Sequence, residues 1–193
     1  MHRPVLVTPP TILPVSVAEV KPHLYEDTSD NDARIVDLIR TATDHLDGWS
    51  GVMGQCLVEQ EWRQDFDRFR SCLHLPLGPV IRVTSVTVGG DALDPSAYSL
   101  KTDAGGRARV EIDRVSFSGA ASVVYKAGHL TIPEVPADGD SPAIPERSSV
   151  PQDIKTAIII YVKAHFDDQK PDAIASAMRA FDDLVSKRRR VGV

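Results

Sequence analysis

The hydrophobic pattern of the chain changes from helical to alternating near Gln55, and this change constrains the fold more than any other feature. Before it, apolar residues recur three or four positions apart, which predicts one amphipathic helix of about 20 residues carrying Ile35, Leu38, Ile39, Ala42, Leu46 and Trp49. From Gln55 the apolar residues alternate, which places Cys56, Val58, Gln60 and Trp62 on one side of an extended strand. A chain with both patterns combines helices with a sheet.

Further helices are indicated on both sides of the alternating region. Ser16 and Glu19 stand three apart in a capping-box arrangement, which predicts a short helix over 17–24. Near the other end, Pro151 is suited to a helix start and precedes an apolar face containing Ile154, Ala157, Ile158, Tyr161, Val162 and His165. Pro171 begins a last helix, with Ile174, Ala177, Met178, Phe181, Leu184 and Val185 recurring helically.

The region between the helices contains only strand patterns separated by turn signals such as Gly89-Gly90-Asp91 and Asp94-Pro95-Ser96. Because no helix intervenes to allow parallel crossovers, we expect an antiparallel sheet or a small sandwich. The expected strands are 55–65, 71–75, 80–88, 97–102, 107–113 and 121–126.

The predicted fold class is therefore α+β, with N- and C-terminal helices packed as a small bundle and an antiparallel β domain inserted between them. Prolines restrict the chain at the N-terminus and again after the strands, which predicts an extended arm and a loop or partly disordered linker. The expected parts are an arm over 1–15, a helical domain over 16–51 and 150–186, a β insert over 55–128, a Pro-rich loop over 131–149 and a basic tail over 187–193.

Composition excludes several protein classes. The chain has 193 residues, 42% of them hydrophobic and 25% charged, as in a soluble domain with arms. It contains no apolar run of about 18 residues and no apolar stretch after Met1, so a membrane or secreted protein is not expected. Cys56 and Cys72 form no metal-binding or disulfide pattern, and we expect thiols packed as small apolar residues in a reducing compartment.

The net charge of −5 is unevenly distributed. Residues 1–186 carry 27 acidic and 18 basic side chains, a balance of −9, whereas Lys187, Arg188, Arg189 and Arg190 add four positive charges. Such a tail could contact phosphate or an acidic protein surface, or could be a solvated helix end. With aromatic residues at only 6%, docking to a protein partner is the stronger hypothesis than specific nucleic-acid binding.

No constellation of residues predicts catalysis, and we expect no catalytic, metal or cofactor site. Gly48-Trp49-Ser50-Gly51 lacks the final Gly of a nucleophile elbow, because position 52 is Val. The six histidines are scattered, and His165 at a helix end is explained by the helix dipole. Asp27, Asp30 and Asp32 lack the Gly and Glu of a calcium loop.

Several short motifs nevertheless occur in an order that resembles the head–tail connector proteins of tailed bacteriophages, also found in prophages and gene transfer particles. Over about residues 14–166 the motifs are Pro14-Val15-Ser16-Val17-Ala18-Glu19-Val20-Lys21-Pro22-His23-Leu24, Asp30-Asn31-Asp32, Ile35-Val36-Asp37-Leu38-Ile39, Gln60-Glu61-Trp62-Arg63, Leu75-Pro76-Leu77-Gly78-Pro79-Val80, Ser85-Val86-Thr87-Val88, Leu93-Asp94-Pro95-Ser96-Ala97-Tyr98, Val124-Tyr125-Lys126-Ala127-Gly128 and Val150-Pro151-Gln152-Asp153-Ile154-Lys155-Thr156-Ala157-Ile158. The 131–149 loop and the basic helix end depart from that pattern.

The resemblance implies a structural adaptor, not an enzyme, that is made in the host cytoplasm and ends in the virion neck. Such adaptors form a ring of about twelve copies beneath the portal protein and join the head to a stopper or tail-completion protein. Packaged DNA would pass through the lumen without specific binding, as an acidic body permits. Alternatives are a stopper or other tail-completion protein and, less favoured, a small hydrolase.

Two sets of residues are assigned expected roles. The last helix and tail are expected to bind the portal through Phe181, Leu184, Val185, Lys187, Arg188, Arg189 and Arg190. Trp49 and Trp62 are expected to be buried, because each carries a large apolar area.

Overall fold

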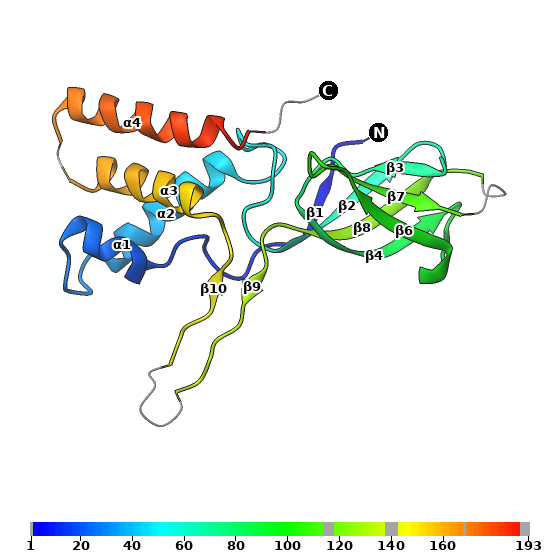
Figure 1. Ribbon diagram of the computed structural model, residues 1–193, viewed down its shortest axis with the longest axis horizontal. Coiled ribbons are helices and arrows are strands. Elements are labelled where there is room, and N and C mark those ends of the chain that lie inside the picture. Colours follow the sequence, from blue (N-terminus) through cyan, green and yellow to red (C-terminus); the bar gives the residue numbers. More distant parts are fainter. Residues whose placement is uncertain (1, 114–117, 138–142, 168, 190–193) are drawn as a thin grey trace. The chain divides into compact units, whose positions relative to one another are not determined.

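The computed structural model describes residues 2–113, 118–137, 143–167 and 169–189 (Figure 1). The chain divides into two compact units. A β unit comprises Met1–Thr11 and Glu59–His129, and a helical unit comprises Ile12–Val58 and Leu130–Val193. Each unit is thus built from two separate segments of the sequence. The predicted α+β class is confirmed.

The first helix of the helical unit, α1 (Val17–Leu24), has the expected bounds and the expected cap. Ser16 Oγ accepts a hydrogen bond from the Glu19 N–H at 3.2 Å, and Glu19 Oε2 accepts one from the Ser16 N–H at 2.8 Å. The helix ends at Tyr25, whose φ of 57° lies in the left-handed region. This short helix is therefore fixed by local hydrogen bonds at both ends.

The second helix, α2 (Asp32–Leu46), ends one turn before the predicted stripe does, and the expectation that Trp49 is buried is wrong. Trp49 is 42% exposed. Beyond Leu46 the chain folds back on the last helical turn, where the Met53 N–H donates to the Leu46 carbonyl. Met53 is fully buried in the core, so it takes the place that the helical period assigned to Trp49.

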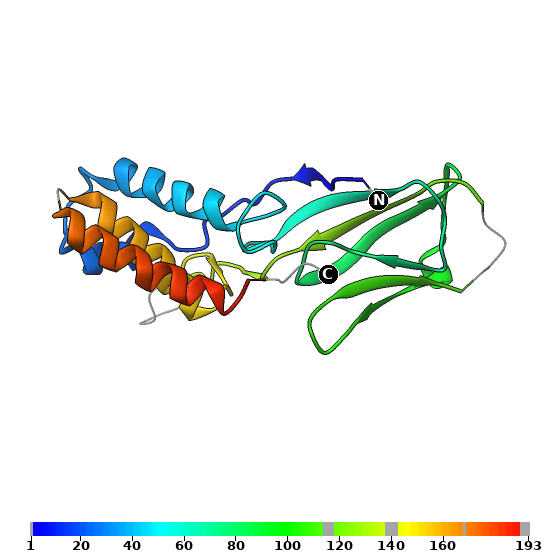
Figure 2. The same ribbon diagram turned by 90° about the horizontal axis from the view of Figure 1, so that it is seen from above.

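The helical unit is completed by α3 (Gln152–Phe166) and α4 (Pro171–Ser186), which run side by side (Figure 2). Apolar faces of all four described helices enclose one core, and its largest fully buried side chains are Ile35, Ile39, Leu46, Met53, Leu57, Ile158 and Phe181. Burial of that area supplies the main stabilisation of the unit.

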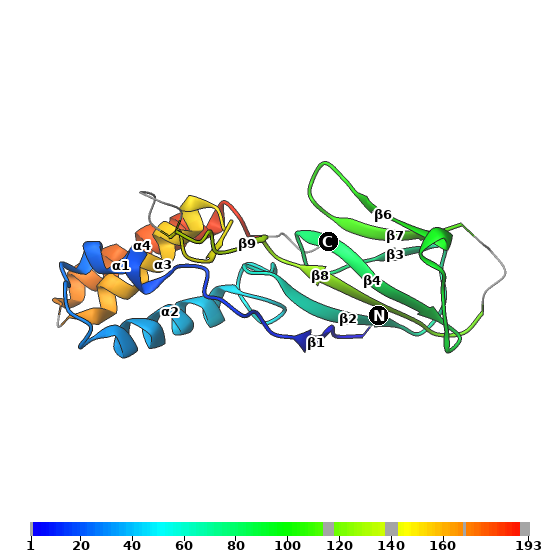
Figure 3. The same ribbon diagram turned by 90° about the horizontal axis from the view of Figure 1, so that it is seen from below.

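The β unit contains only antiparallel pairings among its described strands. One sheet has the order β1-β2-β8-β4-β5 and a second the order β3-β7-β6 (Figure 3). The strands are β1 (Val5–Thr8), β2 (Gln60–Phe66), β3 (Cys72–His74), β4 (Val80–Val88), β5 (Asp91–Ala92), β6 (Tyr98–Thr102), β7 (Ala108–Ile112) and β8 (Ala121–Ala127). A short 3₁₀ turn, Pro95–Ala97, precedes β6.

The larger sheet is organised around β8, where every second residue is buried. Tyr125 at its centre stands opposite Trp62 on β2 and Val83 on β4. Trp62 is 8% exposed, which confirms the expectation for this residue. Cross-strand aromatic pairs of this kind fix the register of the sheet, because a slip of one residue would expose both rings.

The expected strand over 55–65 begins later than the alternating pattern predicts. β2 starts at Gln60, and Cys56, Leu57 and Val58 are all buried, which no single strand face allows. Asp47 explains the difference, because its Oδ1 accepts a hydrogen bond from the Leu57 N–H and holds this segment against the end of α2. The prediction was therefore wrong for residues 55–59.

Candidate assembly surfaces

Large apolar side chains are exposed at two main places in the described chain. Of nine such residues, three lie on β1 and four lie between residues 130 and 144. The first group is Val5, Leu6 and Val7, and the second is Leu130, Ile132, Val135 and Ile144. The other two are Trp49 and Tyr25, which is 88% exposed. Contiguous exposed apolar residues commonly mark a protein interface.

The first surface, which we call the edge strand, is β1. The arm predicted over 1–15 is extended as expected, but Val5–Thr8 pair antiparallel with β2 at the edge of the larger sheet. Gln64, fully buried, fixes the start of this segment by donating from Nε2 to the His2 carbonyl at 2.7 Å. The edge strand is thus an integral part of the sheet, with all four residues exposed.

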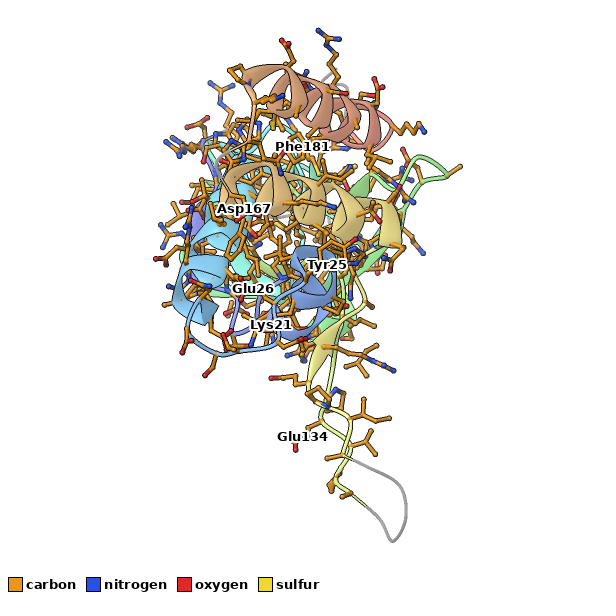
Figure 4. The ribbon with its side chains drawn as sticks, turned by 90° about the vertical axis from the view of Figure 1, so that its left-hand side faces the viewer. Lys21, Tyr25, Glu26, Glu134, Asp167 and Phe181 are labelled. Carbon is orange, nitrogen blue, oxygen red and sulfur yellow. The ribbon has the colours of Figure 1, made fainter. Side chains whose placement is uncertain are left out.

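The second surface, which we call the hairpin arm, comprises residues 130–149. β9 (Thr131–Ile132) and β10 (Arg147–Ser148) pair antiparallel, and an isolated bridge joins Val135 to Ile144. The described part of this segment is therefore an extended hairpin with short paired stretches, a feature that the prediction of a loop or linker did not include. Its base is anchored in the helical unit by Ser148 and Val150, both buried. Figure 4 shows the arm projecting away from the helices of its own unit.

The predicted portal-binding residues divide into buried and exposed groups. Phe181 is fully buried, and its ring centroid lies 5.8 Å from that of Tyr161 and 6.0 Å from that of His45. Val185 is also buried, and Leu184 packs partly buried against the same core. Lys187, Arg188 and Arg189 are exposed, and Arg190 lies outside the described residues. Of the described residues in this set, the basic ones of the tail are accessible, whereas the apolar ones of α4 are buried or partly buried.

The start of the tail is held on the helical unit by Arg188. Its Nε donates to Asp153 Oδ2 at 2.7 Å, and its carbonyl accepts a hydrogen bond from Gln55 Nε2. Partial burial raises the pKa of Asp153, but the hydrogen bonds from Arg188 and from the Ile154 N–H outweigh it and bring that pKa below its ordinary value. The ionised carboxylate at the start of α3 therefore binds the tail.

No group of three His, Cys, Asp or Glu side chains among the described residues could hold a metal ion. His165 stacks on Tyr161 at 4.3 Å between centroids, and its Nδ1 lies 2.8 Å from the Tyr161 carbonyl oxygen. Within the same residues, no helix is long and apolar enough to cross a bilayer.

The sequence carries a signal for both the edge strand and the hairpin arm, and it marks these proline-rich segments as places where an assembly protein would reach its neighbours. In each, prolines bound short apolar stretches, at positions 4, 9 and 10 in one and 133, 136 and 145 in the other. Proline removes a backbone donor and limits strand pairing to short stretches. Apolar residues that cannot join a long strand or a helix are candidates for an intermolecular surface.

Comparison with known proteins shows which solved structures share this fold. No family model and no curated protein matches the chain. Among solved structures, it matches a chain in the neck of an empty GTA particle computed with C6 symmetry, with a TM-score of 0.65, 19% identity and coverage of 100% of this chain and 97% of the other. It shares its fold with a chain of a particle neck.

Two further structures give the same result. A chain in the virion of a native gene transfer agent (GTA) particle matches with a TM-score of 0.65 and 18% identity, covering 98% of this chain and 96% of the other. A chain in the neck of a native GTA particle computed with C12 symmetry matches with a TM-score of 0.61 and 20% identity, covering 100% and 97%. Both structures therefore share the fold of this chain over nearly its whole length.

Proposed function

We propose that this chain is a structural neck protein of a tailed phage or phage-like particle, and that it acts as a head–tail connector. The observation that carries the proposal is its full-length fold likeness to chains of gene transfer agent necks. The ordered motifs between residues 14 and 166, which resemble connector proteins, support the same role. The chain is then an architectural component, not an enzyme.

In this role the chain forms a closed ring of about twelve copies with head-to-tail contacts. A ring of this kind requires two different surfaces on each subunit, one to meet each neighbour. The edge strand and the hairpin arm are two separate exposed apolar surfaces, as this arrangement needs. One of the neck structures with the same fold was computed with C12 symmetry, which supports the proposed copy number.

We assign portal binding to the C-terminal end of α4 and the tail that follows it. Phe181 and Val185 hold α4 in the core, while half-buried Leu184 and exposed Lys187 and Arg189 supply accessible apolar area and positive charge. Arg190 adds a fourth cation to the sequence of the tail. The portal surface that accepts this end should accordingly be acidic. A stopper or tail-completion protein would bind the opposite side of the ring.

The distribution of charge between the units favours passage of DNA without capture. The β unit contains 10 basic and 9 acidic side chains, a balance of +1, whereas the helical unit contains 12 basic and 18 acidic ones, a balance of −6. Since binding of DNA depends largely on neutralising phosphates, a subunit of this composition binds it weakly. Packaged DNA would cross the ring without a specific contact.

The decisive experiment is electron microscopy of the portal protein of the same particle, purified after co-expression with and without this chain. We expect an additional ring of density on one end of the portal, with the rotational symmetry of that complex. A portal particle unchanged by the presence of the chain, at concentrations well above micromolar, would contradict the connector role.

A further inference from the structure

We infer that the hairpin arm of one copy packs against the edge strand of the neighbouring copy, and that this contact closes the ring. The inference rests on the ring formation proposed above, and it identifies the two surfaces that meet. The partner is thus a second copy of this chain. Three observations carry it, namely the distribution of exposed apolar residues, the backbone of the two segments and their charge.

The distribution of apolar residues singles out these two surfaces. Seven of the nine large apolar side chains that the described residues expose lie on them. Val5 and Leu6 point to opposite faces of the edge strand, because side chains alternate along a strand. Packing the arm against this strand removes apolar area of both segments from water, which is favourable. No other described segment presents more than one such residue.

The backbone of the hairpin arm places two of its exposed apolar residues on one face. Val135 and Ile144 are antiparallel bridge partners, so their side chains lie on the same side of the hairpin. The arm extends away from the helices of its unit, with Glu134 exposed on it (Figure 4). Residues that project beyond their own unit can reach a neighbouring subunit without disturbing the core.

The edge strand is suited to receive such a face. Among the described strands, β1 has a neighbour on one side only, and no described strand pairs with its other edge. Pro4 and Pro9 limit that edge to Val5–Thr8, and prolines at 133, 136 and 145 remove backbone donors from the arm. The contact is therefore made mainly by side chains, and it stays confined to one arm and one strand.

The charges of the two segments are opposite. Residues 131–149 contain the acids Glu134, Asp138, Asp140 and Glu146 and one base, Arg147, a balance of −3. Residues 1–15 contain one base, Arg3, and no acid. Glu134, Glu146 and Arg3 are all exposed. Opposite charges steer arm to strand and oppose arm-to-arm pairing, which favours a head-to-tail ring over a symmetric dimer.

Cross-linking in the assembled ring tests which surfaces meet. A chain carrying Leu6→Cys, Ile144→Cys and Cys72→Ser is assembled on the portal and treated with a short bismaleimide. We expect a ladder of covalent oligomers that extends beyond the dimer, and no ladder from either new cysteine alone. If Ile144→Cys alone cross-links as well as the pair, arms meet arms and the inference is overturned.

Disruption of the arm gives an independent measurement. Val135→Asp combined with Ile144→Asp should reduce the ring-bound fraction of the chain about tenfold or more, because it places charge in an apolar contact. Tyr25→Asp combined with Trp49→Asp is the matched control, since it adds the same two charges at exposed apolar sites outside both surfaces, and it should leave the ring intact. Circular dichroism of each variant establishes that the subunits are folded.

Charge reversal separates this inference from the proposed function. Glu134→Lys with Glu146→Lys should weaken ring formation, and Arg3→Glu in the same chain should restore it. If the unmodified chain forms rings and all arm variants form them equally well, the arm contact is wrong although the connector role stands. If the unmodified chain forms no ring on the portal, the connector role itself fails.

Discussion

Lys155 on α3 and Glu19 on α1 form an ion pair, with Lys155 Nζ 2.7 Å from Glu19 Oε1. The lysine side chain is only 10% exposed, whereas the glutamate is 41% exposed. Glu19 also closes the capping box of α1 by accepting from the Ser16 N–H. One carboxylate therefore both caps a helix and neutralises a buried cation on another helix.

Acidification should weaken the helical unit through this carboxylate. Partial burial raises the pKa of Glu19, but hydrogen bonds from Lys155 and Ser16, together with the charge of Lys155, outweigh it and lower the pKa below 4.5. A carboxyl with a lower pKa in the folded state stabilises the fold above its unfolded pKa and loses that effect as the pH falls through the folded pKa. We expect the denaturant concentration at the midpoint of unfolding to decrease as the pH is lowered below about 4.5.

Glu19→Gln tests whether the Glu19 carboxylate causes this acid dependence of stability. The variant should be less stable than the parent by about 1–3 kcal/mol near neutral pH, because Lys155 loses its charged partner while buried. Its stability should also change less between about pH 6 and pH 3. Asp27→Asn, an exposed carboxyl nearby in sequence, is the control and should retain the acid dependence of the parent. Equal acid dependence in all three proteins would contradict the role of Glu19.

Substitution of Trp62 should strongly destabilise the β unit. Trp62→Ala is expected to lower the free energy of unfolding by about 3–5 kcal/mol, because it empties a buried site opposite Tyr125. Trp62→Phe should recover most of that loss, since Trp62 Nε1 has no hydrogen-bond partner among the described residues and its removal leaves nothing unsatisfied. Trp49→Ala should change stability by less than about 0.5 kcal/mol. Denaturant titration measures all three.

Gly51 should not tolerate a side chain. A Cβ at this position would lie 2.3 Å from the carbonyl oxygens of Leu46 and Asp47, both backbone atoms at the end of α2. Gly51→Ala should therefore cost about 1–3 kcal/mol by forcing the loop away from the helix. Gly105→Ala is the control, because the nearest atom to its Cβ would belong to the flexible Asp103 side chain. Thermal unfolding of the two variants should differ by several degrees.

Removal of residues 187–193 should weaken co-purification with the portal and leave the subunit folded. The Arg188–Asp153 pair is exposed enough that its loss costs less than about 1 kcal/mol. Arg188→Ala separates the tail's anchoring from its charge, with Arg179→Ala, an exposed cation on α4, as the control. Undiminished portal capture by the truncated chain would show that the tail is not the docking element.

Local patterns predicted the elements that are determined locally. The capping box placed α1 to the residue, and alternation placed β4 over 80–88, because in each case neighbouring residues decide the backbone. Pairing of β1 with β2 joins residues more than 50 positions apart, and no local pattern encodes it. Trp49 was misplaced because the helix ends at Leu46, and Asp47 already has extended backbone with a ψ of 148°.

The candidate surfaces were harder to predict than the fold. Phe181 and Val185 carry the same helical spacing whether α4 packs on its own core or on a partner, so periodicity could not distinguish burial from docking. The hairpin arm was not predicted for a different reason. Its prolines break the alternation by which strands are detected, and the Val135–Ile144 pairing is an isolated bridge that no continuous strand pattern announces.

The division of each unit between two segments has a mechanical consequence. The backbone passes between the units at residues 11–12, 58–59 and 129–130, so three covalent connections join them. A force that pulls the units apart is therefore shared by these three backbone connections, and no single connection carries it alone. Under a stretching load, a chain connected in this way would resist extension better than two domains joined in series.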